Sequence, residues 1–258
     1  MDEALDLSNY LPLSFKSNSE QEYIAFLWDA FETNYMHDKY QFAFLAYHML
    51  TMSFVYFNIW QIRQARPDDF AKGLIGFPRD EKNLLAATSP FVLSSVNERT
   101  VLRFLKLIAC DNSKIGTYAK LVDDRNETAH SNGHIFFSTQ AALEAKITEI
   151  LRVVAEIQTH SIPIIENCYR DFLLQNNDPE EREYPDASDQ IREMLIHENY
   201  LSQEDINICV DFDMASLADH PQYENMRELH DCLKVAYGSE DVSENKTCRR
   251  SGGCNKYF

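Results

Sequence analysis

The sequence predicts an all-α protein, in which an antiparallel helical bundle is followed by a smaller, acidic helical region. The long segments carry apolar residues at helical intervals, and the alternation typical of strands is scarce. Glycine and proline are few, at seven and eight in 258 residues, whereas an all-β chain needs turn residues at short intervals. With 45% hydrophobic and 12% aromatic residues, the chain can bury a sizeable core.

Six helices are expected before residue 176. Ser19 followed by Glu22 has the form of a capping box and opens the first helix. The second is long and ends at Arg66-Pro67, because the residue before a proline disfavours helix. The stretch after it is rich in proline and glycine and contains only a short third helix. The six helices span about residues 19–35, 38–64, 80–88, 98–110, 113–131 and 138–175.

The last three of these helices have local signals of their own. Asn97 is a capping residue at the start of the fourth helix. Asn132-Gly133 is a stop signal after the fifth. Pro163 lies inside the sixth, where a missing backbone donor predicts a kink.

Beyond the bundle the composition becomes acidic. Residues 171–200 hold nine acidic side chains against two basic ones, together with Pro179 and Pro185, which favours a solvated linker. The expected organisation is a bundle over 1–175, an acidic linker over 176–188, a small helical region over 189–238 and a disordered tail over 239–258.

Residues 41–62 test whether the chain enters a membrane. They contain no charged residue, with His48 taken as neutral, and are long enough to span a bilayer. Six polar residues interrupt the segment, which favours a buried central helix and an ordinary core role for His48. No signal peptide is visible and the six cysteines contain no C-x-x-C pair, so we expect reduced thiols in a cytoplasmic protein without membrane association.

The sequence Arg125-Asn126-x-x-x-His130 carries the strongest chemical signal. Arg125 is a permanent cation whose forked donors suit phosphate, and His130 titrates near neutral pH. Asn126 and His130 are four residues apart and share one helix face, while Asp123 and Asp124 would tie down Arg125 or face water. A second Arg-x4-His string, Arg192 to His197, lacks the asparagine and encloses Met194-Leu195-Ile196, so it is typical of an ordinary amphipathic helix.

Arg125-Asn126-x-x-Ala129-His130, late in one helix and before another long one, resembles the motif of the HEPN family (higher eukaryotes and prokaryotes nucleotide-binding domains). The resemblance covers about residues 20–170. It implies a homodimeric, metal-independent endoribonuclease of the toxin–antitoxin or antiviral-defence type, without a cofactor. His130 would transfer protons, Arg125 would hold the scissile phosphate and Asn126 would orient the imidazole or donate to the phosphate. An antitoxin or another defence-system protein would be its partner.

A basic face is expected in the helix before this motif. Arg99, Arg103 and Lys106 lie at i, i+4 and i+7, and Lys114 and Lys120 follow. Such a face is often simply solvated, but beside the motif it predicts a track for the phosphates of an RNA substrate.

The net charge of −17 argues against unspecific binding of nucleic acid, which depends on lysine and arginine. It supports an alternative function, in which a non-catalytic HEPN-like protein serves as an acidic scaffold or inhibitor of a basic protein partner. The enzyme remains the favoured function because of the motif.

Overall fold

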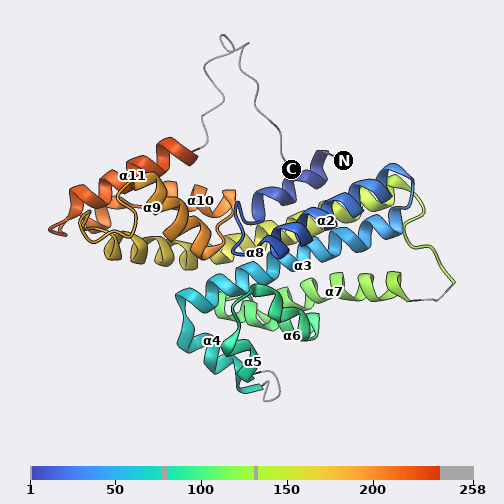
Figure 1. The fold of residues 1–258 in the computed structure, drawn as a ribbon. Coiled ribbons are helices and arrows are strands. Elements are labelled where there is room, and N and C mark those ends of the chain that lie inside the picture. The colour runs from blue at the N-terminus through green and yellow to red at the C-terminus, as the bar shows by residue number, and fades with distance from the viewer. Residues whose placement is uncertain (1, 77–80, 131–132, 239–258) are drawn as a thin grey trace, which may run out of the picture.

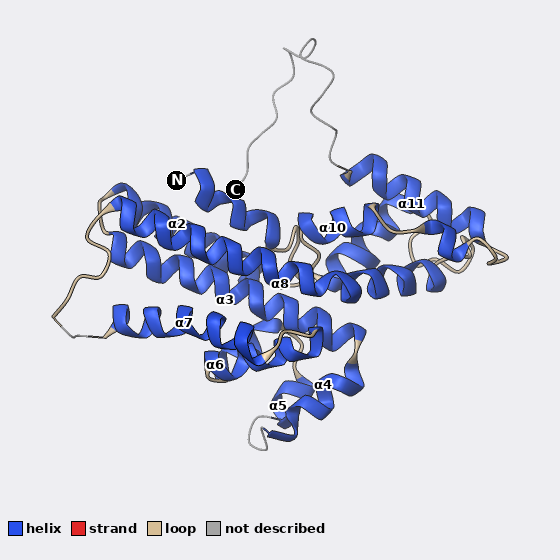
Figure 2. Cartoon of the chain, turned by 180° about the vertical axis from the view of Figure 1, so that it is seen from behind, coloured by secondary structure: helices blue, strands red, loops and turns tan. Residues whose placement is uncertain are grey.

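A computed structural model describes residues 2–76, 81–130 and 133–238 of the chain (Figure 1). Within these ranges every regular element is helical, which confirms the all-α class (Figure 2). In the first part these are α1 Asp2–Leu5, η1 Asp6–Tyr10, α2 Asn18–Met36, α3 Tyr40–Ala65, α4 Pro67–Gly73, η2 Leu74–Gly76, α5 Glu81–Ala86, η3 Pro90–Ser95, α6 Glu98–Val101, η4 Leu102–Ile108, α7 Asn112–Ala129 and α8 Gln140–Gln175. The second part contains α9 Ala187–Gln190, η5 Ile191–His197, α10 Gln203–Val210, η6 Met214–Leu217 and α11 Tyr223–Tyr237.

Helix α3 forms the centre of the bundle. It packs between α2 and α8, with α7 along another side (Figure 1). Helix α3 is long and apolar enough to cross a membrane, and 83% of its most apolar 18-residue window is buried inside the protein. The charge-free segment is thus the core helix of this fold, as its interrupting polar residues predict. Removing such a helix from water supplies much of the bundle's hydrophobic stabilisation.

Two helix boundaries differ from those that the sequence predicts. Ser17, not Ser19, caps α2, and its hydroxyl accepts the backbone N–H of Glu20 at 3.3 Å. Ser17 and Glu20 are also three residues apart, but the Glu20 carboxylate accepts hydrogen bonds from Ser89 and Tyr200 instead of closing the capping box. The expected helix over 98–110 is α6 followed by the 3-10 helix η4, which ends at Ala109 in the left-handed region with φ +63°.

Helix α8 runs through both parts of the molecule (Figure 2). Its buried residues up to Ile164 belong to the bundle core, whereas those from Ile165 onward pack in a second apolar cluster with η5, α10 and α11. The helical period continues unbroken across this change of partner, so the sequence predicts a single bundle helix up to residue 175 and does not reveal the second cluster.

A buried carboxylate joins the two parts. Asp205 in α10 accepts hydrogen bonds from the side chains of Gln61 in α3 and Gln158 in α8, at 3.0 and 2.7 Å. It also accepts from the backbone N–H and the hydroxyl of Ser202, both at 2.9 Å. Every buried donor around Asp205 therefore has an acceptor, which fixes α10 against the bundle.

The helices of the C-terminal region lie between residues 187 and 237, and the stretch 176–186 before them has no regular element longer than a turn. Its segment Ile191–His197 is a π-helix. Four cysteines lie in the described part of the chain and all are free thiols: Cys110, Cys168, Cys209 and Cys232. The expected tail over 239–258, with the other two cysteines, lies outside the described residues.

Candidate functional site

The motif lies at the C-terminal end of α7. Asp111 caps the helix by accepting the backbone N–H of Lys114 at 2.9 Å. Tyr118 and Val122 are buried against the bundle, and Arg125 continues their stripe three residues further on. Arg125 is therefore half-buried, while His130 follows the last helical turn and is exposed.

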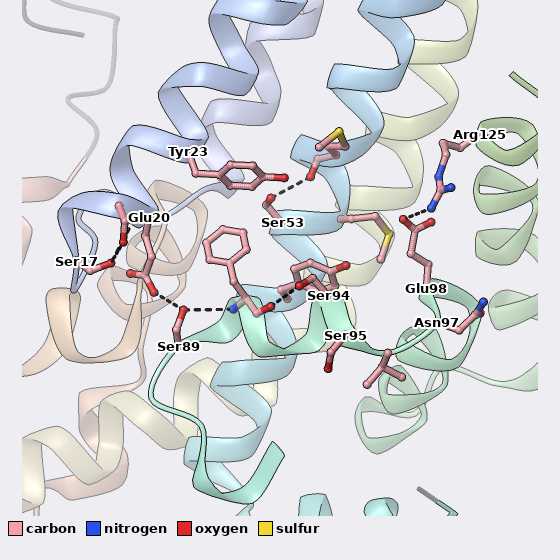
Figure 3. Close-up of a pocket in the computed structure, with 16 residues that line it drawn as sticks. Ser17, Glu20, Tyr23, Ser53, Ser89, Ser94, Ser95, Asn97, Glu98 and Arg125 are labelled. Carbon is pink, nitrogen blue, oxygen red and sulfur yellow. Dashed lines mark hydrogen bonds and ion pairs between the residues drawn. The ribbon is translucent and has the colours of Figure 1, made fainter. Parts of the chain in front are cut away.

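Arg125 is held by two neighbours. Its Nη1 donates to Oδ1 of Asn126 at 2.9 Å, and its Nη2 forms a short ion pair with Oε1 of Glu98 (Figure 3). Glu98 begins α6, and its Oε2 lies 3.1 Å from Nε2 of His48 in α3. Three helices thus contribute to one polar chain, Asn126–Arg125–Glu98–His48.

This polar chain keeps the Glu98 carboxylate charged. Burial alone raises the pKa of Glu98, but the hydrogen bonds and charges of His48 and Arg125 outweigh it, so that the pKa is lowered. His48 is 1% exposed, and no described residue hydrogen-bonds its Nδ1. His48 is therefore buried, as expected, but its Nε2 meets a carboxylate that the sequence did not point to.

His130 has a different environment from the rest of the motif. Its side chain makes no hydrogen bond to any described residue, and its backbone N–H donates to the Asn126 carbonyl at 3.1 Å. The Asn126 side chain meets Arg125 and does not contact the imidazole. The structure therefore joins Arg125 to Asn126, while His130 at the helix end has no side-chain hydrogen bond within the described part of the chain.

The two aspartates before the motif do not hold Arg125. Asp123 pairs with Arg99, and Asp124 accepts a hydrogen bond from Lys146 at 2.8 Å. The expectation that they tie down Arg125 is wrong, because α6 and α8 bring other cations to them, whereas the alternative that they face water holds in part, since both side chains remain partly exposed. The carboxylate that pairs with the Arg125 guanidinium is that of Glu98 in α6.

The predicted basic face is only partly available. Arg99 is paired with Asp123, and Lys114 forms an ion pair with Glu156 at 2.7 Å. Arg103, Lys106 and Lys120 are exposed and form no ion pair within the described ranges. In the 3-10 geometry of η4, residues three apart share one face, so Arg103 and Lys106 remain aligned.

The second Arg-x4-His string lies in the C-terminal region. Arg192 is exposed and paired with Asp189 and Glu193, each at 2.9 Å. His197 lies 3.2 Å from the Ser14 hydroxyl through its Nδ1. These polar surroundings agree with a surface position, but the segment is the π-helix η5 and not the ordinary amphipathic helix that the sequence predicts.

A cavity of about 830 Å³ adjoins Arg125, between α2, α3, η3 and α6 (Figure 3). The sequence does not predict this cavity, because its walls come from segments that are far apart in the chain. His130 is not among the lining residues. Serine hydroxyls line much of it: Ser17, Ser19, Ser53, Ser89, Ser94 and Ser95. The other lining residues are Glu20, Tyr23, Met49, Met52, Tyr56, Phe91, Val96, Asn97, Glu98 and Arg125.

No family model, curated protein or solved structure matches this chain. In the described ranges, no group of three or more histidine, cysteine, aspartate or glutamate side chains is arranged to hold a metal ion.

Proposed function

We propose that the protein is an endoribonuclease that cleaves RNA through the 2′-hydroxyl of its substrate, without a metal ion or cofactor. The observation that carries this proposal is a half-buried arginine and an exposed histidine five residues apart at the end of α7, where the histidine side chain has no hydrogen bond to any described residue. An imidazole without an internal partner can exchange protons with a substrate. The resemblance to HEPN ribonucleases supports the same chemistry, in a cytoplasmic toxin or antiviral-defence role.

In the proposed reaction the 2′-oxygen attacks phosphorus and the bond from phosphorus to the 5′-oxygen breaks. His130 accepts the 2′-hydroxyl proton or protonates the leaving 5′-oxygen. Arg125 contacts the phosphate and stabilises the negative charge that develops on it. Asn126 fixes the guanidinium through their hydrogen bond. The products end in a 2′,3′-cyclic phosphate and a 5′-hydroxyl.

Two copies of the chain would provide an acid and a base together. A single chain offers one His130, whereas the reaction benefits from both functions at once. Apolar side chains near this end of α7 support a contact between copies: Phe42 is 59% exposed and Ile135 73% exposed. Gln41 at the start of α3 connects the end of α7 to the segment that follows it. Its side-chain amide donates to the Thr128 carbonyl, and its side-chain oxygen accepts the backbone N–H of Phe136. Burying such side chains would favour association.

The exposed lysines and arginines would position the RNA. Arg103, Lys106 and Lys120 have no internal ion pair in the part of the chain that is described, so their charges are available to phosphates. Arg99 would also contact the RNA if a phosphate replaced Asp123 as the partner of its guanidinium.

Cleavage of labelled single-stranded RNA in EDTA tests the proposal. His130→Ala should lower the rate by about 10²–10⁴-fold, and Arg125→Ala by a similar factor, while circular dichroism stays unchanged. The matched control is the pair Arg192→Ala and His197→Ala, purified identically, which should retain activity. DNA of the same sequence should remain intact, since it lacks the 2′-hydroxyl. Equal activity of His130→Ala and wild type would refute the proposal.

One observation favours the second function, an acidic scaffold or inhibitor. Glu98 already neutralises Arg125 and Asp123 neutralises Arg99, so part of the predicted RNA site is satisfied internally. Such a protein would bind a basic partner through its charge of −17 and cleave nothing. Binding that weakens steeply with salt, together with no cleavage of any RNA, would support this function over the nuclease.

A further inference from the structure

The cavity beside Arg125 contains a tyrosine hydroxyl that is available to a ligand. Tyr56 is 7% exposed and lines the cavity, and no described residue hydrogen-bonds its hydroxyl. The neighbouring Glu98 and Tyr23 add to the effect of burial in raising the pKa of Tyr56, so this hydroxyl stays protonated and can donate.

The polar groups of the cavity lie at two ends. Figure 3 shows Arg125 and Glu98 on one side, Glu20 and Ser89 on the opposite side, and Tyr23 between them. Between the ends the wall is aromatic: the Phe91 ring meets the rings of Tyr23 and Tyr56 edge-on, with centroids 5.2 and 6.2 Å apart. A flat ligand with an anionic group at one end fits this order of surfaces.

We propose that this cavity binds the guanine base of the RNA nucleotide whose 3′-phosphate contacts Arg125. The base would lie against Tyr23 and Phe91, with its Watson–Crick edge toward Glu20. This inference rests on the proposed ribonuclease and gives it a specificity, namely cleavage on the 3′ side of guanosine. A cavity of about 830 Å³ is large enough for a nucleotide.

The Glu20 carboxylate favours guanine over the other three bases, because it accepts hydrogen bonds and guanine offers it two donors. Guanine presents two adjacent donors, N1–H and the 2-amino group, whereas adenine and cytosine place one amino group beside an acceptor nitrogen. Uracil has carbonyls on both sides of its single N–H, which a carboxylate repels. Among the described residues, Oε2 of Glu20 accepts only the Tyr200 hydroxyl, at 3.0 Å, and can take one guanine donor. Oε1 would take the second donor in exchange for the Ser89 hydroxyl that it now accepts.

Binding of guanosine 3′-monophosphate to the His130→Ala protein tests the site apart from catalysis. Calorimetry should give binding at least tenfold tighter than for the 3′-monophosphates of adenosine, cytidine and uridine. Equal affinity for the four nucleotides, or no binding of any, would overturn the proposal.

A blocking variant locates the binding. Ser95 is exposed at the cavity, and its hydroxyl donates to the Val92 carbonyl at 2.8 Å within η3. Ser95→Trp should fill the cavity and abolish binding. Ser216→Trp is the matched control, because Ser216 is also exposed in a 3-10 helix and donates to the Asp213 carbonyl at 2.7 Å. Equal loss of binding in both variants would contradict the location.

A smaller change tests the unpartnered hydroxyl. Tyr56→Phe removes one oxygen and should weaken guanosine 3′-monophosphate binding about tenfold. Tyr118→Phe, at a buried tyrosine outside the cavity, should leave the affinity unchanged. Unchanged affinity in Tyr56→Phe would remove that residue from the site.

The two proposals fail separately. Cleavage in EDTA that depends on His130 but shows no preference for guanosine in mapped products would overturn the guanine site and leave the ribonuclease standing. Selective guanine binding without any RNA cleavage would uphold the site as one for a free guanine nucleotide and overturn the ribonuclease.

Discussion

Two carboxylates, half-buried Glu98 in the bundle and buried Asp205 in the C-terminal region, have opposite surroundings. Glu98 in the bundle borders the cavity and meets two nitrogen bases, the Arg125 guanidinium and the His48 imidazole. Asp205 in the C-terminal region is fully enclosed and meets only neutral donors, from Gln61, Gln158 and Ser202. Cationic partners lower the pKa of Glu98, whereas burial raises that of Asp205 despite its hydrogen bonds.

We infer from this difference that Glu98 belongs to the candidate functional site, whereas Asp205 stabilises the fold. The ion pair of Glu98 leaves Arg125 partly exposed, so a substrate phosphate can compete for the guanidinium. The donors around Asp205 are buried: the Gln158 amide and the Ser202 N–H are directed at this carboxylate, while Gln61 also donates to the Tyr200 carbonyl at 3.3 Å. Removing the acceptor that several buried neutral donors share lowers the free energy of unfolding, because the donors are then left unsatisfied. We call this contact between α10 and the bundle the Asp205 joint.

The largest effect should come from breaking this joint. Asp205→Ala leaves the Gln158 amide and the hydroxyl and backbone N–H of Ser202 without this acceptor, whereas Gln61 keeps the Tyr200 carbonyl, and should lower the free energy of unfolding by about 3 kcal/mol. Urea denaturation followed by circular dichroism measures it. Asp213→Ala is the control, since Asp213 is an exposed cap of η6 and should cost about 1 kcal/mol. Equal losses in the two variants would mean that Asp205 is no more than a cap.

The dependence of stability on pH should have opposite signs at the two carboxylates. The pKa of Asp205 is raised from 3.8 in the fold, so its contribution relative to Asp205→Asn is largest at low pH and declines as the pH rises above about 3.8. The pKa of Glu98 is lowered from 4.5, so its contribution relative to Glu98→Gln is complete above about 4.5 and is lost as the pH falls below it. Urea midpoints between pH 3 and 7 measure both, and slopes of the same sign would contradict the comparison.

The smallest effect concerns the ion pair at the site. A double-mutant cycle of Glu98→Gln and Arg125→Met should give a coupling energy of roughly 1 kcal/mol, because both side chains are partly exposed to solvent. The fully surface pair of Asp69 and Lys72 provides the reference and should give less than about 0.5 kcal/mol. A coupling no larger than this reference would mean that Glu98 does not hold Arg125.

The sequence predicted what depends on neighbouring residues. The expected helices over 38–64 and 113–131 are α3, Tyr40–Ala65, and α7, Asn112–Ala129, because their apolar periods and stop signals are local. The contact between Arg125 and Glu98 was out of reach, because 27 residues separate them and only the packing of α6 against α7 brings them together. Arg125 had two nearer candidates in Asp123 and Asp124, and tertiary packing assigned both to other cations.

Helix α8 has one further consequence for the molecule. Pro163 has no N–H, so the carbonyl four residues before it lacks its helical partner where the helix passes from one apolar cluster to the other. Helix α8, which has 36 residues and is about 54 Å long, therefore lacks a backbone hydrogen bond at the point where it passes from the bundle core to the second apolar cluster. Contacts between the two parts lie beside this gap: Asp205 accepts from Gln61 of the bundle, and Tyr200, although it lies in the C-terminal region, packs in the bundle core and donates to Glu20. The two parts are therefore held together here by side-chain contacts as well as by the backbone of α8.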